Sequence, residues 1–171
     1  MEFWDVYDSC GRVTGRFKER GSVFNQGEYH LCTSLWIVDP GGEKVLLQLR
    51  SLDKEWSPGL WGITGGAASA GEDSITACIR EVSEEIGLHL RPDEITLLSR
   101  TFLGDTLFDD YVIILDFNIA DAVLQDGEVT ELRWFTFEEV MDLHYSGQLS
   151  FGNITAEIDK LKSHFKAVLG G

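Results

Sequence analysis

The segment from Gly66 to Leu88 constrains the fold of this chain more than any other part of the sequence. Glycines at its start allow a tight loop, and Asp73 and Gly87 are placed to cap the two ends of a helix. Between the caps, apolar residues recur at steps of three and four and form one stripe, made of Ile75, Cys78, Ile79, Val82 and Ile86. The sequence therefore predicts a loop followed by an amphipathic helix that packs one side on a core.

The same helix carries three carboxylates beside its apolar stripe. At about 100° per residue, Glu81, Glu84 and Glu85 fall within an arc of roughly 100°. Like charges at these spacings repel by roughly 0.2–0.5 kcal/mol per pair, and the cost rises next to packed protein unless a cation lies among them. Hard divalent cations such as Mg²⁺ take carboxylate and phosphate oxygens as ligands. The three glutamates alone are typical of a solvated helix face, whereas their register with Gly66, Glu72 and Arg80 favours a metal site.

The spacing of the whole segment resembles the signature of the Nudix hydrolases. It reads as a glycine, five residues, a glutamate, seven residues and then Arg-Glu-Val-x-Glu-Glu-x-Gly-Leu, and every fixed position is filled, by Gly66, Glu72, Arg80, Glu81, Val82, Glu84, Glu85, Gly87 and Leu88. The resemblance implies an α/β fold, the Nudix α/β/α sandwich with a mixed β-sheet, over about residues 30–168. It also implies hydrolysis of a diphosphate linked to another moiety.

The resemblance further implies a role for each residue of the motif. The three helix glutamates bind Mg²⁺ or Mn²⁺ together with the carbonyl of Gly65, and Glu85 or Glu84 activates water or bridges the metal ions. Arg80 holds the catalytic glutamates in place. Structural roles are implied for three further residues, Gly66, Glu72 and Gly87.

One further acidic ligand or base is expected outside the motif. Many Nudix enzymes draw it from the loop ahead of a strand that here ends near Trp134, and Glu128 lies in that loop. Asp126 and Glu131 are rivals for this role, because the sequence does not fix the loop.

Candidate substrate-binding residues precede and follow the motif. Arg50 ends an expected strand and Lys54 follows it, so either could bind the distal phosphate of a substrate as a charged donor. Trp56 and Phe108 are candidates to flank a base or another flat group.

The overall composition restricts the partners. A net charge of −15, with 14 Lys and Arg against 29 Asp and Glu, argues against binding to a nucleic acid polymer. Bound metal would invert the local field and admit an anionic substrate. We expect a small phosphorylated metabolite, a nucleoside triphosphate or a nucleoside diphosphate linked to another group. No apolar run approaches the roughly 18 residues of a membrane span, no signal peptide is visible, and three unpaired cysteines favour a cytoplasmic location.

The pattern of strands and helices predicts a single domain over residues 1–171. It comprises a β extension over residues 1–29 and the Nudix core over residues 30–168. Residues 94–102 and 111–119 are expected to form a hairpin around a loop at 104–110, and a capped helix is expected at 137–145. The N-terminal strands could serve a homodimer.

The N-terminal region carries a second, weaker resemblance, to the isopentenyl-diphosphate isomerases. It rests on Phe3-Trp4-Asp5-Val6-Tyr7-Asp8, on Tyr29-His30 and on Ser57-Pro58-Gly59-Leu60-Trp61. The catalytic cysteine and a further histidine of those enzymes would fall at Gly66 and Ala68 here, so the thiol that their chemistry requires is absent. We interpret the chain as a hydrolase with an isomerase-like extension and His30 as structural. An isomerase and a non-catalytic nucleotide sensor remain the alternatives.

Overall fold

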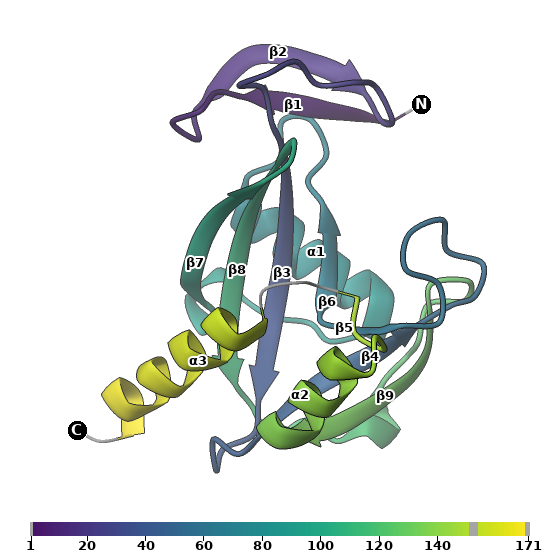
Figure 1. The fold of residues 1–171 in the computed structure, drawn as a ribbon, viewed down its shortest axis with the longest axis vertical. Coiled ribbons are helices and arrows are strands. Elements are labelled where there is room, and N and C mark those ends of the chain that lie inside the picture. The colour runs from purple at the N-terminus through teal and green to yellow at the C-terminus, as the bar shows by residue number, and fades with distance from the viewer. Residues whose placement is uncertain (1, 151–153, 170–171) are drawn as a thin grey trace.

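A seven-stranded mixed sheet forms the middle layer of the protein (Figure 1). The computed structural model describes residues 2–150 and 154–169. The hydrogen-bonded order is β5-β4-β3-β8-β7, with β6 also on β3 and β9 also on β4. β3 runs parallel to β8 and the other neighbours are antiparallel. The strands are β3 (His30–Val38), β4 (Lys44–Arg50), β5 (Trp61–Gly62), β6 (Thr64–Ala67), β7 (Thr96–Leu103), β8 (Thr106–Ile114) and β9 (Val129–Thr136).

Helices cover both faces of this sheet, which confirms the α/β/α sandwich expected from the sequence. Helix α1 (Ser74–Ile86) lies behind the sheet in Figure 1, and α2 (Phe137–Tyr145) and α3 (Ile154–Leu169) lie in front of it. Short 3₁₀ helices occupy Pro92–Glu94 (η1) and Ile119–Asp121 (η2). None of the helices in the described ranges has the length and apolar character that a bilayer crossing requires.

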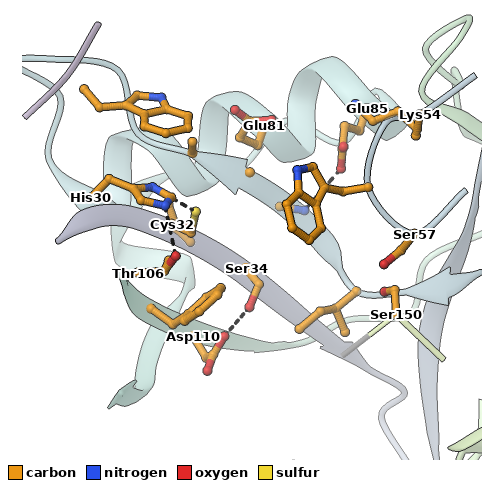
Figure 2. A pocket seen from close by; sticks show the side chains of 18 of the residues that line it. His30, Cys32, Ser34, Lys54, Ser57, Glu81, Glu85, Thr106, Asp110 and Ser150 are labelled. Atoms are coloured by element: carbon orange, nitrogen blue, oxygen red, sulfur yellow. Dashed lines mark hydrogen bonds between the residues drawn. The ribbon is translucent and has the colours of Figure 1, made fainter. Parts of the chain in front are cut away.

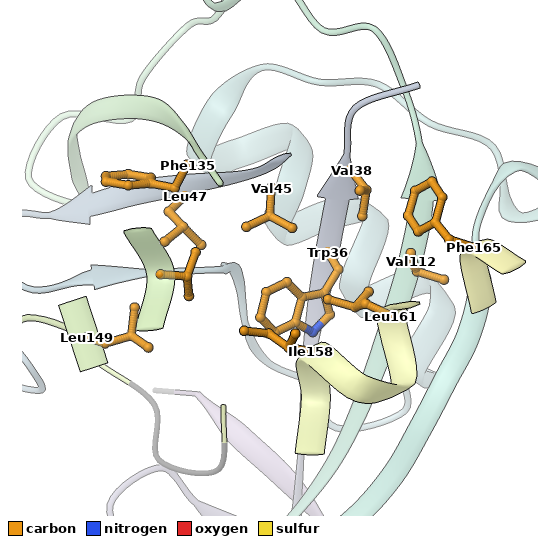
Figure 3. Packing of buried hydrophobic residues seen from close by; sticks show 11 residues of the cluster. Trp36, Val38, Val45, Leu47, Val112, Phe135, Leu149, Ile158, Leu161 and Phe165 are labelled. Carbon is orange, nitrogen blue, oxygen red and sulfur yellow. The ribbon is translucent and has the colours of Figure 1, made fainter. Parts of the chain in front are cut away.

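Alternation along β3 divides the core into two layers. Leu35 and Ile37 pack towards α1, whereas Trp36 and Val38 pack towards α2 and α3, as expected for side chains that alternate across a strand. Figure 3 shows the second layer, in which Trp36 is surrounded by residues of β4, β8, β9 and α3. Its members are Trp36, Val38, Val45, Leu47, Val112, Phe135, Val140, Leu149, Ile158, Leu161 and Phe165.

The helix ends follow the local signals in the sequence. Asp73 accepts a hydrogen bond from the Thr76 amide at 2.8 Å, and Gly87 ends α1 with a left-handed φ of 72°. Thr136 and Glu139 form the capping box of α2. These two helices and their caps were predicted correctly because each depends on neighbouring residues alone.

The predicted hairpin over residues 94–119 was wrong in its loop. The turn is short, and residues 106–110, expected in the loop, belong to β8, which ends at Ile114. β8 is a central strand between β3 and β7, and its two acidic residues have partners there. Arg100 donates two hydrogen bonds of 2.6 Å to Asp109, and Ser34 donates one to Asp110. Asp109 and Asp110 therefore tolerate burial in a central strand, although acidic residues are typical of loops.

The sheet divides between β3 and β4. These strands pair at a single position, Val38 with Val45, while the rest of this edge of β3, from Cys32 to Leu35, pairs with β6 instead. β4, β5 and β9 therefore diverge from β3 and β8 (Figure 1). The cleft described below lies at this divergence.

The N-terminal extension is a separate two-stranded hairpin of β1 (Phe3–Tyr7) and β2 (Val13–Glu19). It lies across the end of the sheet at which β3 begins (Figure 1). Tyr7 pairs with Tyr29 and packs in a small cluster with Leu31 and Leu107. Glu28 binds the side chains of two β2 residues, Arg16 at 2.5 Å and Lys18 at 2.6 Å. These contacts hold the hairpin against the core.

We expect Glu28→Gln to loosen the hairpin at neutral pH. Lys18, the Asn25 amide and Arg16 lower the pKa of Glu28 from 4.5 to about 2. Because the folded pKa lies below the usual value, the stabilisation is present above about pH 4.5 and is lost as the pH falls towards 2. The free energy of unfolding of the variant should therefore fall below that of the wild type at pH 7, and the difference should shrink between pH 4.5 and 2.

Urea titrations across this pH range would measure the difference. Glu19→Gln is the matched control, since Glu19 is exposed at the end of β2 and should leave the free energy of unfolding unchanged. A difference between wild type and Glu28→Gln that is independent of pH would contradict the prediction.

Candidate active site

One cavity of about 1070 Å³ brings the candidate residues together. Residues of α1, β3, β6, β8, the loop after β4 and the N-terminal hairpin line it, and Figure 2 shows Glu81 and Glu85 of α1 across β6 from Cys32 and Ser34 of β3. Glu72 and Gly87 do not line it. The candidates that line it are Arg50, Lys54, Trp56, Gly65, Gly66, Arg80, Glu81, Glu84, Glu85, Phe108 and Glu128.

Glu85 is a buried carboxylate held by neutral donors. Its exposed fraction is 5%, and its Oε2 accepts hydrogen bonds from Gln48 Nε2 at 2.9 Å and from the Gly65 amide at 3.1 Å. Burial raises the pKa of Glu85 to about 7 because desolvation disfavours the charged form more than these two hydrogen bonds favour it. Nearby cationic charge would stabilise this carboxylate.

Gln48 was not identified from the sequence. It is 1% exposed on β4, and its Oε1 accepts a hydrogen bond from Thr64 Oγ1 at 3.0 Å, so its amide nitrogen is turned towards Glu85. The available signal was a polar residue within the apolar strand Lys44–Arg50. A buried polar side chain in such a strand requires a hydrogen-bond partner, which in this protein is the motif helix.

Arg80 ties together the remaining motif carboxylates. It donates two hydrogen bonds of 2.9 Å to Glu72, one of 2.8 Å to Glu81 and one of 3.1 Å to Glu84. Its Nη2 also donates to the Ala67 carbonyl at 3.2 Å. Glu81 is largely buried, and burial raises its pKa despite Arg80, while the Glu84 side chain is 51% exposed. Arg80 therefore fixes the loop that contains Glu72 relative to the helix.

Gly65 and Gly66 allow β6 to approach two neighbours closely. A Cβ atom on Gly65 would lie 2.1 Å from the Thr33 carbonyl oxygen of β3, and one on Gly66 would lie 2.5 Å from the Glu81 carboxyl group. The first contact is with backbone and the second is with the end of a flexible side chain. Both glycines thus allow close packing. The group next to Gly65 is fixed backbone, whereas the group next to Gly66 is a side chain that can move.

We expect alanine at these two positions to have different effects on stability. Gly65→Ala must move the β3 backbone and should lower the free energy of unfolding by about 1–3 kcal/mol or more. Gly66→Ala can turn the Glu81 side chain aside and should cost less than about 1 kcal/mol. Urea unfolding of both variants measures this. Gly65 and Gly71 both have a positive φ, of 157° and 84°, but a Cβ on Gly71 meets nothing within 4 Å, so Gly71→Ala is a control for positive φ without a clash. Equal destabilisation by Gly65→Ala and Gly66→Ala would contradict the assignment.

The loops beside the cavity carry the other candidates. Lys54 and Glu128 form an ion pair, and Arg50 Nε donates to the Trp56 carbonyl at 3.1 Å. The Trp56 side chain is 78% exposed, and Phe108 is half-buried on β8. The rivals of Glu128, Asp126 and Glu131, are exposed and do not line the cavity.

His30 and Cys32 lie at the hairpin end of the cavity. Trp4, which was not a sequence candidate, stacks on His30 with ring centroids 4.3 Å apart, and His30 Nε2 lies 2.9 Å from Thr106 Oγ1. Burial lowers the pKa of His30 and raises the pKa of Cys32 to about 12. Cys32 is therefore a neutral thiol at pH 7. The packing of His30 agrees with its interpretation as structural.

The motif carboxylates provide oxygen donors for a divalent cation, although they are not arranged as a cage. Within residues 2–150 and 154–169, no three His, Cys, Asp or Glu side chains form a preformed metal cage. The motif carboxylates are instead held by Arg80 and Gln48. Glu81 and Glu85 are nevertheless desolvated oxygen donors whose charge burial disfavours. Oxygen donors and uncompensated negative charge fit Mg²⁺ or Mn²⁺.

Known proteins resemble this chain in fold and in sequence. A crystal structure of DR0079 from Deinococcus radiodurans superimposes with a TM-score of 0.76 at 17% identity, covering 94% of this chain and 99% of that chain. An isopentenyl-diphosphate Delta-isomerase of Cutibacterium acnes is 28% identical over 127 residues, 67% of this chain and 63% of the isomerase. The isomerase resemblance is thus matched by a distant relative.

The chain is more similar in sequence to Nudix hydrolases than to this isomerase. An uncharacterized Nudix hydrolase of Listeria monocytogenes is 35% identical over 150 residues, 86% of this chain and 88% of the relative. The model of the NUDIX domain matches residues 28–155, which include the whole motif and all the candidate residues of the cavity. With its α/β/α sandwich and mixed sheet, the chain belongs to the Nudix hydrolases, a family of pyrophosphohydrolases.

Proposed function

We propose that this protein is a Mg²⁺- or Mn²⁺-dependent hydrolase that cleaves the diphosphate of a nucleoside triphosphate or of a nucleoside diphosphate linked to another group. The supporting observation is a single cavity that joins the desolvated carboxylates of Glu81 and Glu85 to two cationic side chains, Arg50 at the end of β4 and Lys54 in the loop after it. Its volume of about 1070 Å³ suits a ligand of nucleotide size.

In this proposal, Glu81, Glu84 and Glu85 bind the metal with the Gly65 carbonyl and Glu128. The metal would supply charge neutralisation for the diphosphate oxygens and Lewis-acid activation of water. Glu85 is the preferred essential carboxylate, because its position is fixed by Gln48 and by the Gly65 amide. Arg80 would keep its two hydrogen bonds to Glu72 if Glu81 and Glu84 turned to the cation, so the loop would stay braced.

The substrate would be bound by side chains from two loops and a strand. Lys54 is paired with Glu128, and recruitment of Glu128 to the metal would release the ammonium group to bind a phosphate. Arg50 donates through Nε to the Trp56 carbonyl, which fixes the guanidinium beside the cavity. Trp56 and Phe108 present aromatic surface to a base or another flat group.

The isomerase alternative lacks a competent thiol in this site. Gly66 and Ala68 occupy the positions at which that enzyme class has its cysteine and a histidine. Cys32 also lines the cavity, but its pKa of about 12 keeps it protonated. Acid–base catalysis by a Cys32 thiolate is therefore not supported.

We expect Glu85→Gln to reduce metal-dependent turnover on the order of 10²–10³-fold, the effect of removing a charge-stabilising group from an active site. The glutamine oxygen can still accept the hydrogen bonds of Gln48 and Gly65, so the fold should be retained. Isopentenyl diphosphate should be assayed separately for its double-bond isomer. With Mg²⁺, cleavage of nucleotide sugars, dinucleotides and nucleoside di- and triphosphates should be measured by chromatography of the products. Chelation of the metal should abolish it.

Glu131→Gln is the matched control, since Glu131 is an exposed glutamate outside the cavity and should keep full turnover. Full activity of Glu85→Gln would refute the assignment. Conversion of isopentenyl diphosphate to its double-bond isomer would favour the isomerase. Binding of a nucleotide without any turnover would favour the sensor.

A further inference from the structure

Four cationic side chains of the described residues line the cavity, and they are not equivalent. Arg80 is engaged with the motif carboxylates, Lys54 with Glu128, and Arg50 with the Trp56 carbonyl. The fourth, Arg20, comes from the N-terminal hairpin, which precedes the residues matched by the family model. Its place in the cavity has no counterpart in the signature of the motif.

The hairpin positions Arg20 relative to the motif loop. The Arg20 amide donates to the Glu2 carbonyl at 2.9 Å and so closes the open end of the hairpin. The hairpin in turn binds the loop before α1, where the Ala70 amide donates to the Phe3 carbonyl at 2.8 Å and the Gly71 amide donates to Asp5 Oδ2 at 2.6 Å. Arg20 is therefore carried by a segment that is bonded to the catalytic loop.

The guanidinium of Arg20 has donors to spare. Its Nη1 binds Glu2 Oε2 at 2.8 Å, and its central carbon lies 5.9 Å from the Trp4 ring centroid. In the part of the chain that the structure describes, its Nε and Nη2 have no hydrogen-bond acceptor. A planar group with one paired and two unpaired nitrogens can bind further oxygens without leaving its place.

Arg20 lies within electrostatic range of several charged groups of the cavity. The hydrogen bond that Arg20 donates to Glu2 is the main cause of its raised pKa, and the charges of Glu81 and Glu128 add to it. Arg20 in turn lowers the pKa of Cys32 on the cavity floor, against the larger effect of burial. The guanidinium thus shares the cavity with the motif carboxylates and lies within electrostatic range of Glu81.

We propose that Arg20 binds a phosphate of the substrate in the cavity that it shares with the motif carboxylates. This inference rests on the proposed function, which supplies a ligand with at least two phosphates. Guanidinium groups bind two phosphate oxygens at once, and an acidic cavity needs such donors to hold a polyanion. Glu2 occupies one nitrogen and partly neutralises the guanidinium, so it weakens substrate binding.

The first test compares KM and kcat of three variants on the substrate that the wild type cleaves. Arg20→Gln should raise KM by about 10- to 100-fold, as expected for loss of a charge-assisted hydrogen bond, and should change kcat much less. Arg12→Gln is the matched control. Arg12 belongs to the same hairpin segment and also pairs with a carboxylate, Asp8, but lies outside the cavity. An equal KM for these two variants would overturn the proposal.

Glu2→Gln separates phosphate binding from a structural role. If Arg20 binds phosphate, removal of the Glu2 charge should lower KM or leave it unchanged. If the Arg20–Glu2 pair serves only to close the hairpin, Glu2→Gln should raise KM as much as Arg20→Gln does, and the proposal fails.

Calorimetric titration with inorganic diphosphate and Mg²⁺ provides a readout that does not depend on turnover. Arg20→Gln should weaken diphosphate binding by about tenfold or more relative to Arg12→Gln. Absence of turnover by the wild type would refute the proposed hydrolase, whereas an unchanged Kd for diphosphate would refute the role of Arg20. The two failures are therefore seen separately.

Discussion

The carboxylate of Glu85 lies between the Gln48 amide and the Gly65 backbone, within a protein whose net charge is already −15. Neutral dipoles hold it in place without removing its charge. The single cation of the motif, Arg80, acts on the other side, where it binds Glu72, Glu81 and Glu84. Arg80 therefore compensates the charges of the other motif glutamates but not that of Glu85. The uncompensated, desolvated charge of Glu85 lies where β6 meets α1. A divalent cation placed there would relieve the cost of burial, which is the physical basis for the proposed chemistry.

β6 and the loop that follows it connect the N-terminal hairpin to the motif helix. Gly65 and Gly66 let β6 pack against β3 and α1, and the loop that follows β6 binds the hairpin through two backbone amides. Tyr7 completes this connection by packing with residues of β3, β8 and α1. Displacement of the hairpin would thus disturb the loop that Glu72 and Arg80 brace. The N-terminal hairpin is therefore part of the site, although it precedes residues 28–155, which the model of the NUDIX domain matches.

Sequence reasoning succeeded where the determinants are local. The bounds and caps of α2, the caps of α1 and the stripe of Cys78, Val82 and Ile86 follow from neighbouring residues. It failed for residues 106–110, because Asp109 and Asp110 are satisfied by Arg100 and Ser34, which are distant in sequence or on another strand. Gln48 and Arg20 were missed for the same reason. Each reaches the site through tertiary placement, which the spacing of a motif does not encode.

The groups proposed for the reaction and for the substrate differ in their origin. Three of the proposed metal-binding carboxylates come from five consecutive residues of one helix, whereas the cavity cations Arg20, Arg50 and Lys54 come from the hairpin, the end of β4 and the loop after it. A helix keeps its geometry when distant segments change, but separate segments can be displaced or replaced independently. A relative that is 35% identical can therefore share the catalytic helix and select a different substrate. Substrate choice by the proposed hydrolase would therefore depend on where the hairpin, the end of β4 and the loop after it place their cations.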